Sequence, residues 1–213
     1  MVIWIMSILI ISYLIGAIHG SKVAQFFSGV NIKKEGLKNS GASNAAIVLG
    51  MKYGILVALI DILKGVIVII GVRFFVQQYG MFSNGQQDLF IYLAGAAVIL
   101  GHNFPVYTGF KGGKGTASII GILFAFYWPI GLIGLLLLIG TTFLTDFLLI
   151  GVFVFYFVFL GASIWFAEGV GPIAVSLCLF VMALVLHIEN FRRLARKEEP
   201  RISAFLKKKK PSV

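Results

Sequence analysis

The chain has little charge and almost no cysteine. Of its 213 residues, eight are aspartate or glutamate, 12% are charged and one is cysteine. A soluble domain is about one-quarter charged, so this composition excludes an ordinary soluble domain. A single cysteine also excludes an intrachain disulfide and a cluster of thiolates around a metal ion.

Apolar residues dominate instead. They make up 59% of the chain, with a mean hydropathy of +0.99. Long apolar runs such as 55–70 and 147–167 are separated by short polar loops, which is typical of membrane-spanning helices. The sequence therefore predicts an all-α, polytopic membrane protein with seven transmembrane helices, over residues 2–18, 47–75, 89–100, 116–127, 129–144, 147–167 and 170–188.

The net charge of +10 is unevenly distributed. Most basic residues lie in residues 20–46, 111–114 and 192–210, whereas the loops 77–88 and 168–172 have no lysine or arginine. The positive-inside rule then places the N-terminus outside and the C-terminus in the cytoplasm. This organisation divides the chain into a membrane domain (1–191) and a basic cytoplasmic tail (192–213). Because the charge follows membrane topology, we expect Lys207–Lys210 to contact anionic lipids and expect no nucleic-acid binding.

Residues 101–116, here called the glycine loop, carry the strongest polar signal. They read GHNFPVYTGFKGGKGT and separate two apolar runs. Glycines let backbone N–H groups converge on an anion, and a helix beginning at Thr116 directs its positive dipole end to the same place. The loop is not a Walker motif. Thr108 stands where that motif requires its first glycine, and Gly115 stands where it requires Ser or Thr. It is either a phosphate site or a flexible membrane loop with snorkelling lysines.

Three further polar groups accompany the glycine loop. Residues 39–44 (NSGASN) precede a long helix and supply either substrate donors or an ordinary helix cap. Asp61 and Lys64 share a helix face inside an apolar run, as a structural pair or as a substrate contact. His187 and Asn190 share a face where the last span ends, for proton transfer or phosphate binding, or simply as a polar membrane exit. Together with residues 145–146, these regions are expected on the cytoplasmic side.

Taken in order, these segments resemble the bacterial acyl-phosphate:glycerol-3-phosphate acyltransferase family. The glycine loop matches the family signature GHxFPxxxxFKGGKG, and residues 50–65 match its second-helix pattern through Asp61 and Lys64. The tail matches HxxNxxRL through His187, Asn190, Arg193 and Leu194, and Glu199 falls where the family has a glutamate.

The resemblance implies a seven-helix enzyme of the bacterial inner membrane that uses no metal and no cofactor. Such an enzyme moves a fatty acyl group from acyl phosphate to the first hydroxyl of glycerol 3-phosphate, giving lysophosphatidic acid. Its site opens to the cytoplasm, and its partners are these two substrates and membrane lipids.

The resemblance also implies roles for individual residues. His187 and Asn190 would position or deprotonate the attacking hydroxyl. The donor phosphate would lie against the backbone N–H groups of the glycines, with lysines balancing its charge; this set comprises His102, Lys111, Gly112, Gly113, Lys114, Gly115 and Thr116. The acceptor side would comprise Lys38, Asn39, Ser40, Ser43 and Asn44.

The chain departs from the family on the acceptor side. Where the family reads GSGNxGATNxxR, Leu37 replaces a functional serine and Ile47 a functional arginine; where it reads TRYVS, Asp146 replaces an arginine and Leu149 a serine. Neither Leu nor Ile binds phosphate, and losing one charge-assisted contact costs about 2–5 kcal/mol of binding. Lys38 is a candidate for restoring one positive charge.

These departures leave several functions open. The acceptor is glycerol 3-phosphate bound weakly, or a less anionic alcohol or amine. Alternatively, the chain is a non-catalytic relative that binds acyl phosphate or lipid. A transporter is the last alternative, supported by the intramembrane Asp61 and Lys64 and by the short helices.

Overall fold

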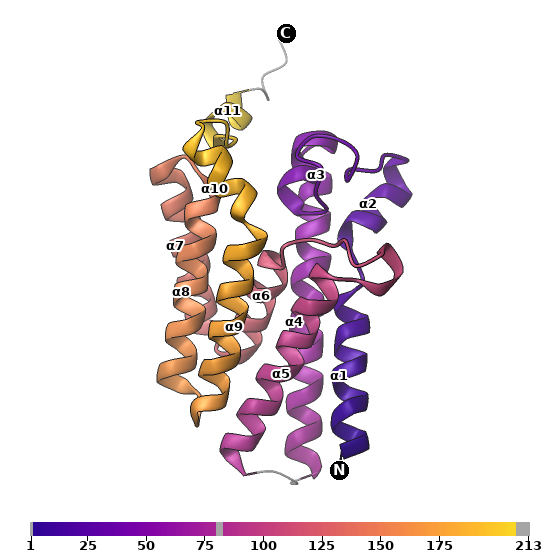
Figure 1. The fold of residues 1–213 in the computed structure, drawn as a ribbon, viewed down its shortest axis with the longest axis vertical. Helices are drawn as coiled ribbons and strands as arrows, with labels where there is room; N and C mark the ends of the chain where they lie inside the picture. The colour runs from indigo at the N-terminus through magenta and orange to yellow at the C-terminus, as the bar shows by residue number, and fades with distance from the viewer. Residues whose placement is uncertain (1, 80–82, 208–213) are drawn as a thin grey trace.

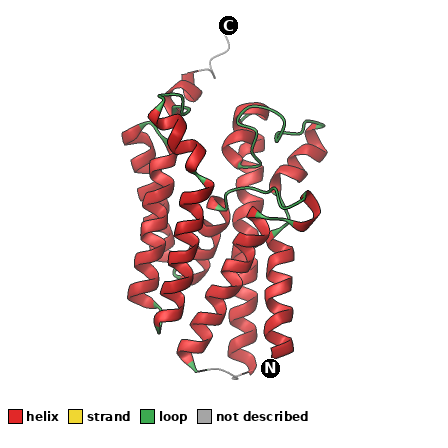
Figure 2. Ribbon diagram, viewed as in Figure 1, coloured by secondary structure: helices red, strands yellow, loops and turns green. Residues whose placement is uncertain are grey.

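The computed structural model describes residues 2–79 and 83–207, and within these ranges the chain is helical, with one short 3₁₀ turn and no strand (Figure 2). The all-α prediction is therefore confirmed. The elements are α1 (Val2–Gly16), α2 (Gly20–Ser28), α3 (Ala42–Leu49), α4 (Met51–Tyr79), α5 (Asn84–Asn103), η1 (Val106–Thr108), α6 (Thr116–Phe126), α7 (Trp128–Thr145), α8 (Leu148–Phe166), α9 (Val170–Leu186), α10 (Ile188–Ala195) and α11 (Ile202–Lys207).

The helices form a polytopic membrane bundle. Within the described residues, five helical segments are long and apolar enough to cross a membrane, and a sixth is formed if α9 and α10, which meet at a 49° bend, count as one span. The seventh predicted span, α6, has 11 residues, or about 16 Å of helix. That length is about half of a hydrocarbon core of about 30 Å.

The bundle has two sides joined by α6. Helices α1, α4 and α5 lie together on one side, α7, α8 and α9 lie on the other, and α6 stands between them (Figure 1). The buried core is rich in aromatic rings, including Phe155, Tyr156 and Phe159 on α8. Tyr92 and Phe126 stack 4.3 Å apart between α5 and α6. Burial of these large rings stabilises the bundle where the two sides meet.

Close packing of α1 on α5 positions the end of α5, from which the glycine loop leaves. A Cβ atom added at Gly101 would lie 2.0 Å from the carbonyl oxygen of Tyr13, and one at Gly16 would lie 2.2 Å from that of Val98. No side chain fits at either contact, so only glycine allows the two backbones to approach this closely.

Several predicted helix boundaries are wrong. The helix predicted over residues 47–75 is interrupted at Gly50, whose φ of +91° suits glycine, and forms α3 and α4 instead. The helix predicted over residues 89–100 is α5, which begins earlier because Ser83 and Gln86 form a capping box. The polar segment 20–46 also contains α2, which was not predicted as a helix.

Helix α6 is short because it is enclosed by protein. Its buried residues include Ile119, Ile122 and Leu123. Arg73 of α4 donates hydrogen bonds to the carbonyl oxygens of Ala125 (3.0 Å) and Phe126 (3.3 Å) at its C-terminal end. Unsatisfied carbonyls are costly inside a membrane, so Arg73 permits the helix to end at this depth.

The polar segments gather toward one end of the molecule. Helices α2, α3 and α10 and the glycine loop lie in the upper half of the view in Figure 1, and the N-terminal end of α1 lies at the bottom. The clustering of these segments agrees with the shared side predicted from the charge distribution. The predicted lipid contact of Lys207–Lys210 falls largely outside the described residues and stays a prediction.

Candidate active site

The glycine loop is anchored on the last turn of α5. The backbone N–H groups of Gly112 and Gly113 donate to the carbonyl oxygens of Asn103 (2.9 Å) and His102 (3.0 Å). A Cβ atom at Gly112 would lie 2.1 Å from the His102 carbonyl oxygen, and one at Gly113 would lie 2.1 Å from His102 Nε2. These glycines therefore permit close approach, and their N–H groups are already used. The prediction that both N–H groups bind phosphate is corrected on this point.

The open N-terminus of α6 remains available to an anion. Gly115, with φ of +80°, is the N-cap of α6, and Thr116 is its first residue. The first four N–H groups of a helix have no partner within it, and the helix dipole adds partial positive charge there. Helix α6 therefore begins two residues after Lys114, and the binding of an anion at this N-terminus stays a prediction.

Lys114 connects the glycine loop to the tail. Its ammonium donates to Asn190 Oδ1. Asn190 Nδ2 in turn donates to Glu199 Oε1 at 2.6 Å, and Arg193 Nε donates to Glu199 Oε2 at 2.8 Å. Two motifs far apart in the sequence therefore meet in one hydrogen-bonded chain, which is called the tail network below.

Burial and the charged groups of the tail together set the charge state of Lys114. Burial and the nearby Arg193 lower the pKa of Lys114 from 10.5 to about 8, while Glu199 and Glu189 oppose this shift. The ammonium is thus present at neutral pH and is lost as pH rises through about 8.

His187 is buried at the bend between α9 and α10. Its Nδ1 lies 2.8 Å from the Ala183 carbonyl oxygen. A carbonyl only accepts, so Nδ1 carries the proton and, in the neutral ring, Nε2 keeps its lone pair. The edge of the ring also packs against Phe153 at 5.5 Å between centroids. His187 therefore has an unprotonated Nε2 in its neutral form and lies one turn before Asn190.

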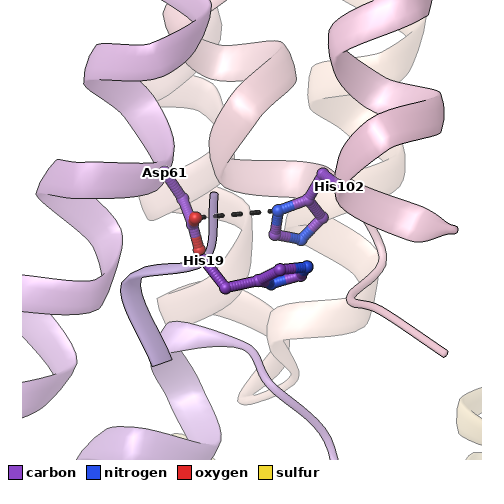
Figure 3. A group of neighbouring side chains, drawn as sticks. All are labelled: His19, Asp61 and His102. Carbon is purple, nitrogen blue, oxygen red and sulfur yellow. Dashed lines mark ion pairs between the residues drawn. The ribbon is translucent and has the colours of Figure 1, made fainter. Parts of the chain in front are cut away.

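A buried cluster of four side chains lies beneath the glycine loop. Lys64 Nζ lies 3.0 Å from Asp61 Oδ1 and 2.7 Å from His102 Nδ1. It also donates to the Ile18 carbonyl oxygen at 2.8 Å. His102 Nδ1 also lies 3.6 Å from Asp61 Oδ1 (Figure 3). The structure thus brings the predicted pair Asp61 and Lys64 into contact, and adds His102 to it.

His19 is the member of this cluster that sequence reasoning missed. It lies between α1 and α2, it is 3% exposed, and its ring stacks 4.6 Å from that of His102. The sequence feature that could have identified His19 is its position directly before Gly20, at the end of an apolar run. Gly20 N–H itself donates to Asp61 Oδ1 at 3.3 Å, which ties the start of α2 to the cluster.

The same cluster offers ligand atoms of the kind that bind metals. Atoms of His19, Asp61 and His102 lie within 4.8 Å of one another. The Lys64 ammonium, however, bonds to both Asp61 and His102. It supplies the positive charge at this point and would repel a divalent ion at such distances. We therefore assign Lys64 as the cation of the cluster.

The predicted acceptor-side residues shape a loop over residues 31–41, which we call the acceptor-side loop. Asn44 is fully buried. Its Oδ1 accepts from Leu37 N–H at 2.7 Å, and its Nδ2 donates to the Ile32 carbonyl oxygen at 2.7 Å. Asn39 Oδ1 accepts from Gly41 N–H at 2.9 Å. These two amides thus hold the backbone of the loop, and their predicted role toward the acceptor stays a prediction.

The remaining acceptor-side residues differ in exposure. Lys38 is exposed with φ of +52°, and Ser43 is half-buried in the first turn of α3. Ser40 is fully buried, and its hydroxyl has no hydrogen-bond partner among the described residues. Lys33 Nζ donates to the Lys111 carbonyl oxygen, so the acceptor-side loop touches the glycine loop.

The four residues that depart from the family pattern lie in different parts of the structure. Two of them, at positions 146 and 149, lie outside the acceptor-side loop and α3. Leu149 is 3% exposed and belongs to the hydrophobic core. Asp146 contacts Arg201 and Ser203 of the tail. Leu37 is half-buried in the acceptor-side loop and Ile47 is 42% exposed on α3.

The similarity of this chain to known proteins extends over nearly its whole length. The family model described as "Glycerol-3-phosphate acyltransferase" matches residues 6–197. The chain is 42% identical over 200 residues to glycerol-3-phosphate acyltransferase 1 of Oceanobacillus iheyensis, covering 94% of this chain and 96% of the relative. It is 33% identical over 199 residues to glycerol-3-phosphate acyltransferase 2 of Thermotoga maritima, with coverage of 92% and 95%.

Two solved structures share the fold. Both are crystal structures of PlsY, described as an integral membrane glycerol 3-phosphate acyltransferase. The glycerol 3-phosphate form gives a TM-score of 0.82 at 29% identity and covers 93% of this chain and 95% of that one. The lysophosphatidic acid form gives 0.79 at 30% identity, with coverage of 92% and 94%.

Proposed function

We propose, from the premise that this chain belongs to the glycerol-3-phosphate acyltransferase family, that it transfers a fatty acyl group from acyl phosphate to glycerol 3-phosphate in membrane phospholipid synthesis. The family resemblance found in the sequence motifs is confirmed by the match over residues 6–197. The observation that carries the proposal is the contact between Lys114 and Asn190, because it joins the glycine loop to the segment that holds His187.

In this mechanism the donor phosphate lies at the N-terminus of α6. Partial positive charge at that end and the Lys114 ammonium stabilise the phosphate as it becomes the leaving group. Lys111 is exposed beside it and adds charge. Gly112 and Gly113 hold the loop against α5, so that Lys114 and the α6 N-terminus face the same place.

His187 and Asn190 act on the acceptor. His187 Nε2, or an oxygen of the donor phosphate, takes the proton of the first hydroxyl as its oxygen attacks the acyl carbonyl. The bond between the carbonyl carbon and the phosphate oxygen breaks, and phosphate leaves with its electron pair. The products are lysophosphatidic acid and inorganic phosphate.

The membrane topology of this proposal has seven crossings. Five or six are long enough by themselves, and α6 completes the set as a short crossing enclosed by protein and ended by Arg73. The basic loops then place the N-terminus outside, the tail in the cytoplasm and the site at the cytoplasmic face of the bacterial inner membrane. Asp61 and Lys64 form a closed pair with His102, which supports a structural role rather than transport.

A second acceptor class is favoured by the residues of the acceptor-side loop and α3. Leu37 and Ile47 provide no charge for a phosphate. Lys33 Nζ is already bonded to the Lys111 carbonyl oxygen, which leaves Lys34 and Lys38 as the exposed cations of the loop. A less anionic alcohol or amine needs fewer cationic partners than glycerol 3-phosphate.

An acceptor panel tests the proposal. The full-length chain, purified in detergent micelles, is supplied with palmitoyl phosphate and with glycerol 3-phosphate, glycerol, ethanolamine or water alone. We expect lysophosphatidic acid as the main product. Acylation of glycerol or ethanolamine in preference to glycerol 3-phosphate would establish the second acceptor class. If no acyl group is transferred to any acceptor, the proposed acyltransferase activity is refuted.

A further inference from the structure

Asp146 faces the tail through four contacts. It ends α7 with φ of +68°, and its Oδ1 and Oδ2 accept from the Ser203 N–H (2.7 Å) and hydroxyl (2.6 Å). Its carbonyl oxygen accepts from Ile202 N–H at 3.1 Å. The Arg201 guanidinium lies 3.9 Å from Oδ2 and 5.6 Å from the ring centroid of Phe147. The aspartate at position 146, where the family pattern has an arginine, thus binds the tail in this chain.

The segment held by Asp146 contains Glu199. This residue lies two positions before Arg201, and its side chain is 8% exposed. Its carboxylate accepts from Asn190 and from Arg193 of α10. Residues 196–203 are therefore fixed at two points, by Glu199 against α10 and by Asp146 at the turn between α7 and α8.

We propose that Asp146 is a positioning residue for acyl transfer, which holds Arg201–Ser203 and thereby keeps Glu199 on Asn190 and Asn190 on Lys114. Hydrogen bonds join Asp146 to Ser203, Glu199 to Asn190 and Asn190 to Lys114. The backbone of residues 199–203 connects the first of these bonds to the second, and the series ends at the glycine loop. The inference rests on the proposed function, because only a catalytic Lys114 gives this positioning a role in turnover.

Electrostatics around Lys114 provide a specific readout. The groups that face Lys114 are Arg193, Glu189 and Glu199 on α10 and the following segment, together with His187 at the bend. Glu199 raises the pKa of Lys114 against the effect of burial. If Glu199 leaves its place, the pKa of Lys114 falls below about 8, and the ammonium is lost at a lower pH. A general loss of stability would not produce this shift.

The experiment compares Asp146→Ala with Asp146→Asn, which keeps an acceptor for Ser203, and with Arg196→Gln as a matched control. Arg196 is exposed at the end of α10, and its guanidinium has no hydrogen bond or ion pair among the described residues. Two quantities are measured for each full-length variant: the KM for palmitoyl phosphate between pH 6 and 10, and the pH at which Lys114 is half-labelled by an amine-reactive reagent, read by mass spectrometry.

We expect Asp146→Ala to raise the donor KM about tenfold, to shift the alkaline limb of activity to lower pH and to lower the labelling midpoint of Lys114. Asp146→Asn should recover part of each effect, and Arg196→Gln should match the natural chain. An unchanged labelling midpoint in both Asp146 variants would overturn the inference. Labelling needs no turnover. An inactive natural chain would therefore refute the proposed function, while the labelling midpoint would still decide whether Asp146 holds Glu199 in its place beside Lys114. If Asp146→Ala fails to fold, Asp146→Asn gives the same decision.

Discussion

At the scale of single residues, the proposed chemistry depends on two side chains whose states are set by their neighbours. Lys114 is partly buried beside cations and carboxylates, so its pKa lies near 8 rather than above 10. His187 is fixed by the Ala183 carbonyl in the tautomer that leaves Nε2 as a base. In both cases the sequence motif predicts the residue, and the fold determines its protonation.

The first residue-scale prediction concerns pH. If the Lys114 ammonium stabilises the donor phosphate, kcat/KM for acyl phosphate should fall as pH rises through about 8, because the charged form exists below the pKa. A pH–rate profile measures this limb. Lys114→Arg, whose charge persists above pH 12, should retain part of the activity and lose the alkaline limb. If kcat/KM of Lys114→Arg still falls at the same alkaline pH, the group that titrates is not Lys114.

The second prediction concerns His187. His187→Gln removes the base and should lower kcat by about 10²–10⁴-fold with a small change in both KM values. Steady-state kinetics with varied donor and varied acceptor separate these effects. His19→Gln is the comparison, because His19 is an equally buried histidine in the cluster beneath the loop. An equal kcat loss in both variants would argue for a general structural effect.

At the scale of elements, the loops are held by contacts that sequence patterns do not reveal. The spans predicted over residues 129–144, 147–167 and 170–188 correspond closely to α7, α8 and α9, because long apolar runs leave few alternatives. The break at Gly50 and helix α2 were missed, because each depends on tertiary packing. The role of Asn44 in holding the loop was missed for the same reason. Its hydrogen bonds reach residues 32, 37 and 39, and no local sequence signal distinguishes this role from substrate binding.

An element-scale prediction tests how the glycine loop is seated. Gly113→Ala places a Cβ atom 2.1 Å from His102 Nε2, so the loop must move away from α5 and displace Lys114. We expect a loss of about 10²-fold in kcat/KM for the donor, since misplacement of about 1 Å has effects of this size. Gly140→Ala is the control, because a Cβ there meets nothing within 4 Å. Equal activity of the two variants would show that the loop tolerates the displacement.

At the scale of the whole molecule, the two halves of the site have diverged to different extents. The donor half keeps the glycine loop, Lys114 and the tail network, and its residues meet as the motif order predicts. The acceptor half has Leu37 and Ile47 where the family pattern has serine and arginine. The motifs were sufficient to predict the family, and the glycine loop and the tail motif that they mark meet in the fold; the binding of the donor there stays a prediction. The tail's attachment to Asp146 was not predictable, because position 146 was interpreted only as a lost cation.

A whole-molecule prediction follows for the acceptor half. The double variant Leu37→Ser/Ile47→Arg restores a hydroxyl and a guanidinium, and it should lower the KM for glycerol 3-phosphate by about tenfold or more. The donor KM should stay within about twofold, because the glycine loop is untouched. Michaelis constants for both substrates check this result. A higher acceptor KM would mean that this chain binds its acceptor by a different set of contacts.

The stoichiometry of the reaction tests the central claim most directly. Purified full-length chain is incubated with palmitoyl phosphate and radiolabelled glycerol 3-phosphate, and lysophosphatidic acid and inorganic phosphate are counted together. The account predicts equal amounts of both products, and none above background for a Lys114→Met/His187→Gln variant. Phosphate release without lysophosphatidic acid, or equal product from the double variant, would contradict it.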